Sequence, residues 1–246
     1  MTTVLKLGGS TITVKDEPET VDSEALAATA ETIAANHEST DRLVVVHGGG
    51  SFGHHHAANH GVGESQGTCD ATAVRDIHRA MGRLNEHVVD ALAAVGLEAV
   101  PVRPLSAAHR DAEANLSLPA EQIETMLAEG FLPVVHGDVI AHADAGATIL
   151  SGDVIVVALA RSLAAERVGL CSTVSGVLDD AGEVIAEIDS YDDVAAVLGE
   201  SEATDVTGGM AGKVQRLLEL DVPASIFDSD ALAEFLETGS AGTVVR

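Results

Sequence analysis

Two apolar runs in this sequence end directly in glycines, and this pattern restricts the fold more than any other feature. The run at 43–46 is followed by His-Gly-Gly-Gly-Ser at 47–51, and the run at 2–7 is followed by Gly8 and Gly9. The run at 43–46 is continuously apolar, as is typical of a strand buried on both faces of a parallel sheet. The sequence therefore predicts an α/β protein whose strands end in glycine-rich turns.

The rest of the chain alternates between strand and helix patterns. We expect further strands at 98–102, 132–135 and 168–172 and a last one from 224, helices at 22–36, 70–95, 153–163 and 210–220, and a hairpin around 179–183. This alternation predicts a three-layer αβα sandwich with a mostly parallel open sheet, in which ligands bind at the carboxyl ends of the strands. Residues 1–246 are expected to form one domain of two lobes that meet near 140–152.

The charge of the chain restricts its partners. The formal net charge is −26, and the acids are scattered among apolar residues that make up 46% of the sequence. Such a surface repels nucleic acid and anionic membranes. It suits a cytoplasm of very high salt, where self-repulsion is screened, although an acidic protein from ordinary salt is the alternative.

Other features favour a cytoplasmic protein. No apolar run approaches the roughly 20 residues needed to span a bilayer, and no signal peptide is recognised. Cys69 and Cys171 lack CxxC spacing, so reduced thiols are favoured, with a disulfide left open.

Only three lysines, Lys6, Lys15 and Lys213, occur in the chain, against 39 Asp and Glu. Lys6 and Lys213 lie close to glycine pairs, where a backbone can approach an anion closely. The glycine turns can present N–H groups to phosphate, although each turn can equally be a tight strand-to-helix connection. Neither turn matches GxxxxGK[ST] or GxGxxG. We interpret the lysines as anion ligands, with chance survival as the alternative.

Histidines gather just after the second glycine turn. His54 closes that turn and could donate a hydrogen bond to a bound phosphate. His56 and His60 have the i, i+4 spacing of a metal site, but no Cys or acid completes the set, and surface filler is the alternative for them and for His55. No metal ligand is therefore assigned.

An apolar stripe with helical spacing runs from Val74 to Val88. Such a stripe is usually core packing, and a lining for a small apolar substrate tail is the sharper alternative.

Taken together, these motifs resemble the amino acid kinase family. They span nearly the whole chain in the family's order and comprise the stretches at 6–10, 47–54, 136–138, 151–153 and 205–213. Gly48–His54 and the stretch 77–83 resemble the branch that phosphorylates isopentenyl phosphate in isoprenoid biosynthesis by an alternative mevalonate route. A branch that phosphorylates fosfomycin shares much of the pattern. Another small anionic acceptor, or a non-catalytic nucleotide or oxyanion sensor, stays open as an alternative.

The resemblance implies roles by position. It implies catalytic roles for Lys6, Lys15, His54, Asp153 and Lys213. It implies ATP contacts for Lys6, Leu7, Gly8, Gly9, Ser10, Gly50, Thr173, Gly208, Gly209 and Lys213. It implies acceptor contacts for Gly49, Gly50, Ser51, His54, Gly152, Val74, Ile77 and Met81. The cofactor would be ATP with Mg²⁺ carried by the nucleotide, the acceptor lobe about 1–150, the nucleotide lobe about 151–246, and the assembly a homodimer.

One stretch departs from the family. Relatives commonly carry Asp-x-Asp-Gly-Val near the nucleotide, but here Thr173 and Ser175 take the places of both acids. Hydroxyl groups therefore replace carboxylates in this loop, which the resemblance places near the nucleotide.

The expected chemistry needs no catalytic base. The second pKa of a phosphate monoester is about 6, so the acceptor is already mostly deprotonated at neutral pH. An anion must then attack an anion, and catalysis reduces to alignment and charge neutralisation. Lysines, one histidine and backbone N–H groups supply both.

Overall fold

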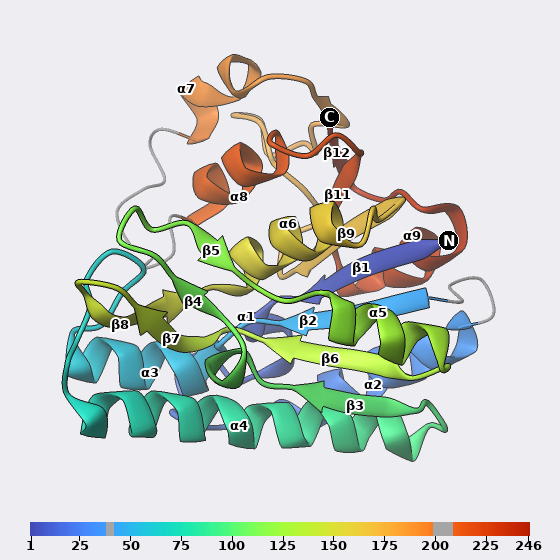
Figure 1. Ribbon diagram of the computed structural model, residues 1–246. Helices are drawn as coiled ribbons and strands as arrows, with labels where there is room; N and C mark the ends of the chain where they lie inside the picture. Colours follow the sequence, from blue (N-terminus) through green and yellow to red (C-terminus); the bar gives the residue numbers. More distant parts are fainter. Residues whose placement is uncertain (38–41, 199–208) are drawn as a thin grey trace.

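A computed structural model describes residues 1–37, 42–198 and 209–246. Within these residues eight strands form one sheet in the order β10-β12-β11-β9-β1-β2-β6-β3 (Figure 1). Their bounds are β1 (Thr2–Leu7), β2 (Arg42–His47), β3 (Ala99–Val102), β6 (Leu132–His136), β9 (Arg167–Ser172), β10 (Glu187–Ile188), β11 (Ala224–Asp228) and β12 (Thr243–Val245). All neighbouring pairs are parallel except β11 and β12. The mostly parallel sheet is confirmed.

Helices cover both faces of this sheet, as Figure 1 shows. On one face lie α5 (Glu121–Ala128), α6 (Gly152–Ser162) and α8 (Gly209–Leu217), and on the other α2 (Ser23–Ala35), α4 (Ala71–Ala94) and α9 (Leu232–Thr238). Alternate residues of one strand serve the two cores: Val4 packs with the first set and Leu5 with the second. The three-layer sandwich follows from strands that are apolar on both faces.

The predicted helices form close to their expected bounds. The Asp70 side chain accepts the Thr72 N–H at the start of α4, and Asp22 caps α2 in the same way through the Ala25 N–H. The apolar stripe of α4 faces the core, with Ile77 and Met81 almost completely buried. Burial of one face and an N-cap thus explain why this stretch is helical.

The sequence did not predict a second sheet. Within the described residues β4 (His109–Arg110), β5 (Leu116–Ser117), β7 (Asp138–His142) and β8 (Gly146–Leu150) form it in the order β5-β4-β7-β8. Two of its strands are only two residues long, too short for an alternating pattern. The hairpin between β7 and β8 covers the candidate boundary near 140–152, and the division into two lobes stays a prediction.

Several further elements had no clear sequence pattern. The helices α1 (Gly9–Ile12) and α3 (Gly50–His60) follow the glycine turns, α7 (Ala195–Leu198) follows β10, and the strand expected to be last is followed by β12. Short 3₁₀ turns occur at Pro104–Ser106, Tyr191–Asp193 and Ser229–Ala231. The predicted hairpin is confirmed by the Leu178–Val184 bridge. Both cysteines are free thiols, Cys69 exposed and Cys171 buried. Among the described helices, none is long and apolar enough to cross a membrane.

Candidate active site

A cavity of about 860 Å³ opens at the carboxyl ends of β1, β2, β6 and β9. The sheet edge at which ligands are expected is therefore the one that is hollowed. Of the site residues expected from the sequence, those that line the cavity are Lys6, Gly8, Gly9, Ser10, Lys15, Gly49, Gly50, Ser51, His54, Ile77, Met81, Gly152, Asp153, Thr173, Gly209 and Lys213. Gly208 lies outside the described residues.

The floor of the cavity is a buried ion pair. The Nζ of Lys6, near the end of β1, lies 2.7 Å from the Oδ1 of Asp153 in the first turn of α6. Both side chains are almost completely buried. Burial alone would raise the pKa of Asp153, but the charges of Lys6 and Lys213 outweigh it and hold this pKa below its ordinary value. Asp153 is thus favoured as a carboxylate, and this carboxylate orients the Lys6 ammonium group.

The two glycine turns pack against each other, backbone to backbone. A Cβ placed on Gly9 would lie 2.1 Å from the nitrogen of Gly50, a separation that no side chain allows. Gly50 itself has φ +48°, and its Cβ would lie 2.3 Å from the Thr13 Oγ1. Glycine at 9 and 50 is therefore required by the approach of one turn to the other.

Some of the expected anion donors are already used within the protein. The Gly8 N–H donates to the Cys171 carbonyl and the Gly48 N–H to the Leu7 carbonyl, at 2.8 and 3.0 Å. Ser51 gives its N–H to the Thr13 hydroxyl and its own hydroxyl to the Thr20 carbonyl. These groups hold the turns in shape, and Leu7 itself is fully buried in the core below the cavity.

Two exposed side chains stand on the rim. His54 is exposed on α3 and lines the cavity, and Lys15 does so from the hairpin between Thr13 and Val21. The N-terminus of α3 begins at the second glycine turn, so its helix dipole favours an anion there. A flexible ammonium group, an imidazole and a helix terminus thus converge on one opening.

Helix α8 brings the third lysine to the cavity. Lys213 lines it from one side, and its Nζ lies 3.4 Å from the Gly209 carbonyl oxygen of its own helix. One turn later, Arg216 donates to the Oε2 of Glu64 at 2.7 Å. Glu64 follows α3 in the chain and also lines the cavity, so this ion pair connects the two sides of the opening. No sequence motif singled out Glu64.

An apolar compartment adjoins the part of the cavity that the glycine turns line. Ile77 and Met81 of α4 form one wall, and Ile149 and Leu150 of β8 form another. A Cβ on Gly53 would lie 2.7 Å from the Met81 sulfur, so α3 and α4 touch here. The structure does not bring Val74 to the cavity: it packs against the cluster around Val62 and Val139.

Behind the glycine turns lies a buried histidine pair that sequence reasoning missed. His47 and His136 are completely buried and stack with ring centroids 5.6 Å apart. Burial lowers the pKa of His47 to about 3, so the ring is neutral, and its Nδ1 lies 3.1 Å from the Gly48 carbonyl oxygen. A neutral ring must carry its proton on Nδ1 to donate there. Each histidine ends an apolar run and precedes a glycine, a signal that the sequence did contain.

Asp138 is another buried acid that the motif at 136–138 quoted without a role. Its Oδ2 accepts a hydrogen bond from the Nδ1 of His78 at 2.9 Å, and its Oδ1 accepts the Val139 N–H at 2.8 Å. The hydrogen bond to Asp138 raises the pKa of His78 above its ordinary value. The pair ties α4 to β7 beside the apolar compartment.

Three other histidines of α3 have protein partners. His55 contacts Asn59, His56 contacts Glu19, and His60 contacts Asp76. Among the described residues no group of three His, Cys, Asp or Glu could hold a metal ion. The i, i+4 spacing of His56 and His60 therefore places the two rings against separate carboxylates, Glu19 and Asp76.

Comparisons with known proteins agree with this geometry. The model of the amino acid kinase family matches residues 1–221. The chain is 60% identical to the isopentenyl phosphate kinase of Haloferax volcanii, covering 99% of this chain and 98% of that protein. It is 37% identical to the enzyme of the same name from Methanothermobacter thermautotrophicus, over 88% and 86% of the two chains. A crystal structure of isopentenyl phosphate kinase superposes over the full length of both chains with a TM-score of 0.82 at 30% identity.

Proposed function

The chain belongs to the amino acid kinase family, and from this premise we propose that it transfers the terminal phosphoryl group of ATP to isopentenyl phosphate. The products are isopentenyl diphosphate and ADP. The observation that carries this proposal is a single cavity in which lysines and glycine turns adjoin an apolar compartment. The 60% identity to an isopentenyl phosphate kinase over nearly the full length supports the same acceptor.

The acceptor phosphate would bind between the second glycine turn and the rim. We assign the contact with its oxygens to His54 and to the start of α3, where the helix dipole favours an anion. The isoprenoid tail would lie against Ile77 and Met81. Each CH₂ of the tail that is buried there would contribute about 0.8 kcal/mol to binding. The acceptor would thus be held at both ends, which aligns its phosphate oxygen with the nucleotide.

Charge neutralisation would come from the three lysines. Lys6 is oriented by Asp153, Lys15 reaches from the rim, and Lys213 stands on α8. An ammonium group is compact and carries three donors, which suits a site where two phosphates share one edge. The developing charge on the transferring phosphoryl group is the one that these cations would stabilise.

ATP would supply the phosphoryl group and would carry Mg²⁺ on its phosphates. The residues of the cavity fit this assignment. Lys6 engages only the Oδ1 of Asp153 on the cavity floor, so the second oxygen of this carboxylate could contact the Mg²⁺ of the nucleotide. Mg²⁺ in kinase sites is commonly held by one or two carboxylates together with substrate phosphates. Thr173 lines the cavity at the end of β9 and offers a hydroxyl where relatives have an acid.

The test is an ADP-release assay in high potassium chloride with isopentenyl phosphate, dimethylallyl phosphate, fosfomycin and small amino acids as separate acceptors. We expect ATP consumption that depends on isopentenyl phosphate. Turnover with fosfomycin or an amino acid and none with isopentenyl phosphate would reassign the acceptor. ATP binding without turnover on any of these acceptors would make the protein a sensor.

Two finer features belong to the same proposal. We expect the enzyme to require high salt, because a net charge of −26 destabilises the compact state unless it is screened. We also expect a homodimer. Light scattering coupled to size exclusion, at high and at low potassium chloride, measures both the mass and its salt dependence.

A further inference from the structure

Lys15 stands on an exposed hairpin, so something must hold its ammonium group over the cavity. The hairpin begins at Thr13 and ends at Val21, which pair in an antiparallel bridge. The Val14 N–H donates to the Thr20 carbonyl at 3.0 Å. Lys15 itself is exposed, and a lysine side chain in solvent samples many rotamers.

The two ends of the hairpin are fixed on the start of α3. The Thr13 hydroxyl accepts the Ser51 N–H at 3.1 Å and donates to the Gly9 carbonyl at 2.8 Å. On the return side the Glu19 N–H donates to the Ser51 carbonyl at 3.3 Å, and Thr20 bonds with the Ser51 hydroxyl. Ser51 is therefore the common anchor of both hairpin strands.

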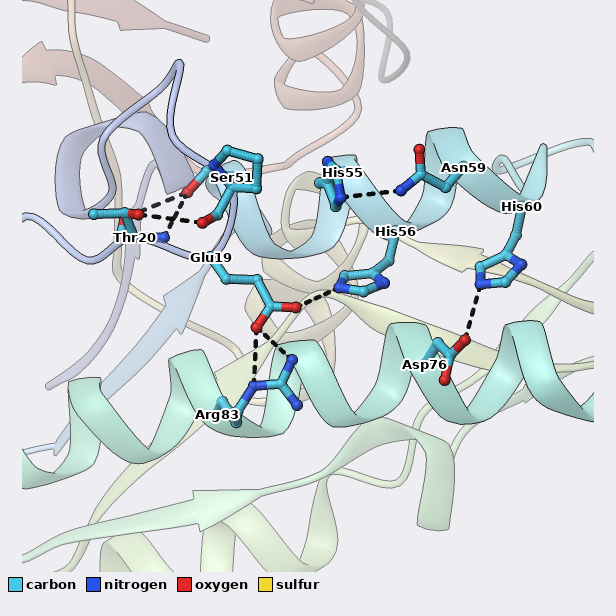
Figure 2. A network of polar contacts seen from close by, with 10 residues as sticks. Glu19, Thr20, Ser51, His55, His56, Asn59, His60, Asp76 and Arg83 are labelled. Atoms are coloured by element: carbon cyan, nitrogen blue, oxygen red, sulfur yellow. Dashed lines mark hydrogen bonds and ion pairs between the residues drawn. The ribbon is translucent and has the colours of Figure 1, made fainter.

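The carboxylate of Glu19 adds a second anchor, which reaches two helices. Its Oε1 contacts the Nε2 of His56 on α3 at 2.5 Å, and its Oε2 accepts from the Nε and Nη2 of Arg83 on α4 at 3.1 and 2.5 Å. Figure 2 shows His56 and Arg83 approaching Glu19 from the two helices. Burial alone would raise the pKa of Glu19, but the hydrogen bonds from His56 and Arg83 outweigh it and lower this pKa.

The backbone at Glu19 gives independent evidence that this position is specified. Its φ is +51°, in the left-handed region that a residue with a side chain rarely adopts. This conformation persists only where surrounding contacts determine it. The contacts present are the Ser51 carbonyl on the backbone side and His56 and Arg83 on the side-chain side.

We propose that Glu19 is a positioning residue, which clamps the Lys15 hairpin to α3 and α4 and so holds the Lys15 ammonium group at the transferring phosphoryl group. The proposal rests on the proposed function, because that function assigns Lys15 to the reaction. Glu19 does not line the cavity, so its effect on the reaction is indirect, and the hairpin that it clamps carries Lys15. Loss of the clamp should lower kcat and leave the KM for isopentenyl phosphate nearly unchanged, as for an interaction made in the transition state.

The sign of the effect separates this clamp from simple electrostatics. Glu19→Gln removes a negative charge close to a site that binds two anions, and by Coulomb's law alone this should assist binding. The clamp instead predicts a loss of activity. The kcat should fall by about 10-fold to 100-fold, the scale for a misplaced catalytic group. Glu17→Gln is the matched control, because Glu17 is exposed on the same hairpin and does not line the cavity.

The first test is a double-mutant cycle of Glu19→Gln with Lys15→Ala. If Glu19 acts through Lys15, the double variant should have the kcat of Lys15→Ala alone within about twofold, whereas independent sites would multiply their losses. Arg83→Gln should reproduce the Glu19→Gln loss from the partner's side, and Arg83→Lys should restore part of the rate. A wild-type rate in Glu19→Gln, or a full second loss in the Lys15→Ala background, would overturn the proposal.

The second test needs no turnover. Amide hydrogen exchange of residues 13–20 should rise in Glu19→Gln and stay at the wild-type rate in Glu17→Gln. Unchanged exchange in Glu19→Gln would overturn the clamp, whatever happens to the rate. If isopentenyl phosphate is not a substrate at all, the proposed function fails, and hydrogen exchange still decides whether Glu19 holds the hairpin.

Discussion

Lys6 on the cavity floor and Lys15 on its rim both end in an ammonium group, but different parts of the protein hold the two side chains in place. Lys6 extends from a central strand and is neutralised by Asp153, with both side chains almost completely buried. Lys15 is exposed on a hairpin that surface contacts hold against α3 and α4. The comparison teaches that a buried cation needs a paired anion to keep the folded protein stable. An exposed cation is already solvated, and it needs only contacts that orient its side chain towards the cavity. Removing one charge of the floor pair should therefore cost stability and activity, and substitutions on the rim should cost mainly activity.

The largest effect is expected when the buried lysine is replaced by another cation. A cation at a transferring phosphoryl group contributes about 10³–10⁵ in kcat, and Lys6→Arg and Lys213→Arg keep the charge while changing the donor geometry. We expect each to lower turnover by about 10³ or more with the fold intact, as measured by steady-state kinetics and circular dichroism. The Lys6 side chain packs closely against the start of α6, because a Cβ on Gly152 would lie 3.1 Å from its Cε.

Arg75→Lys is the control for these two variants, since Arg75 is exposed on α4 and does not line the cavity. It should change the free energy of unfolding by less than about 0.5 kcal/mol. Wild-type rates for both Lys6→Arg and Lys213→Arg would mean that the surviving lysines are accidents of composition.

Asp153→Asn tests the stability side of the comparison. It leaves the Lys6 ammonium group buried without its anion, which costs about 3–5 kcal/mol of unfolding free energy. Because the pKa of Asp153 is lower in the folded protein than its ordinary 3.8, the wild type has the full contribution of this carboxylate above about pH 4. The wild type loses it as the pH falls through the folded-state pKa, and the variant should lack this part of the acid transition.

Urea unfolding from neutral to acid pH measures both effects, with Asp90→Asn on the exposed side of α4 as the control. An unchanged midpoint in Asp153→Asn at neutral pH would remove the distinction between floor and rim.

His54→Ala tests the rim. As a donor to the acceptor phosphate, His54 should be worth about 10²–10³ in turnover, the scale for losing a preorganised donor, and His54→Gln should keep part of it. Because His54 is exposed, the melting temperature should hardly move. His60→Ala is the matched control on the same helix, since His60 pairs with Asp76 away from the cavity. Equal rates for the two alanine variants would show that the assignment of His54 is mistaken.

The smallest effect concerns the apolar compartment. Replacing Ile77 or Met81 by Ala should admit longer prenyl phosphates, since each added buried CH₂ contributes up to about 0.8 kcal/mol. Val74→Ala should leave the substrate ratio unchanged, because Val74 packs away from the cavity. We would compare kcat/KM on isopentenyl and geranyl phosphates with thermal melting of each variant. A loss of about 2–5 kcal/mol in the free energy of unfolding, with an unchanged substrate ratio, in Ile77→Ala and Met81→Ala would show that the stripe is core packing only.

The sequence could predict the parts of this structure that repeat a simple pattern. Apolar runs ending in glycine indicated β1 and β2 and placed the ligand site at their ends, and the 3.6-residue stripe indicated α4. It could not predict the second sheet, because β4 and β5 are two residues long, nor α3, whose glycines and histidines have low helix propensity. Tertiary contacts, not local preference, make these elements.

The site shows the same division. The resemblance to the amino acid kinase family implied a shared site for Lys6, Asp153 and Lys213, which are far apart in the chain, and all three line the cavity. The partnerships of Glu19 with Arg83 and of Glu64 with Arg216 join positions that no periodicity connects. His47 and His136 were missed for another reason, because a histidine after an apolar run looks like the first polar residue of a loop.

The backbone contact between Gly9 and Gly50 also bears on how such a protein can evolve. Each turn occupies the space that a side chain on the other would need, so neither position has a permissible first substitution, and a change in one cannot be rescued by a change in the other. A lineage that acquires a new acceptor must therefore leave this pair of turns untouched. It can vary the cavity walls contributed by α4 and β8, which are made of side chains, and saturation mutagenesis should show tolerance concentrated there.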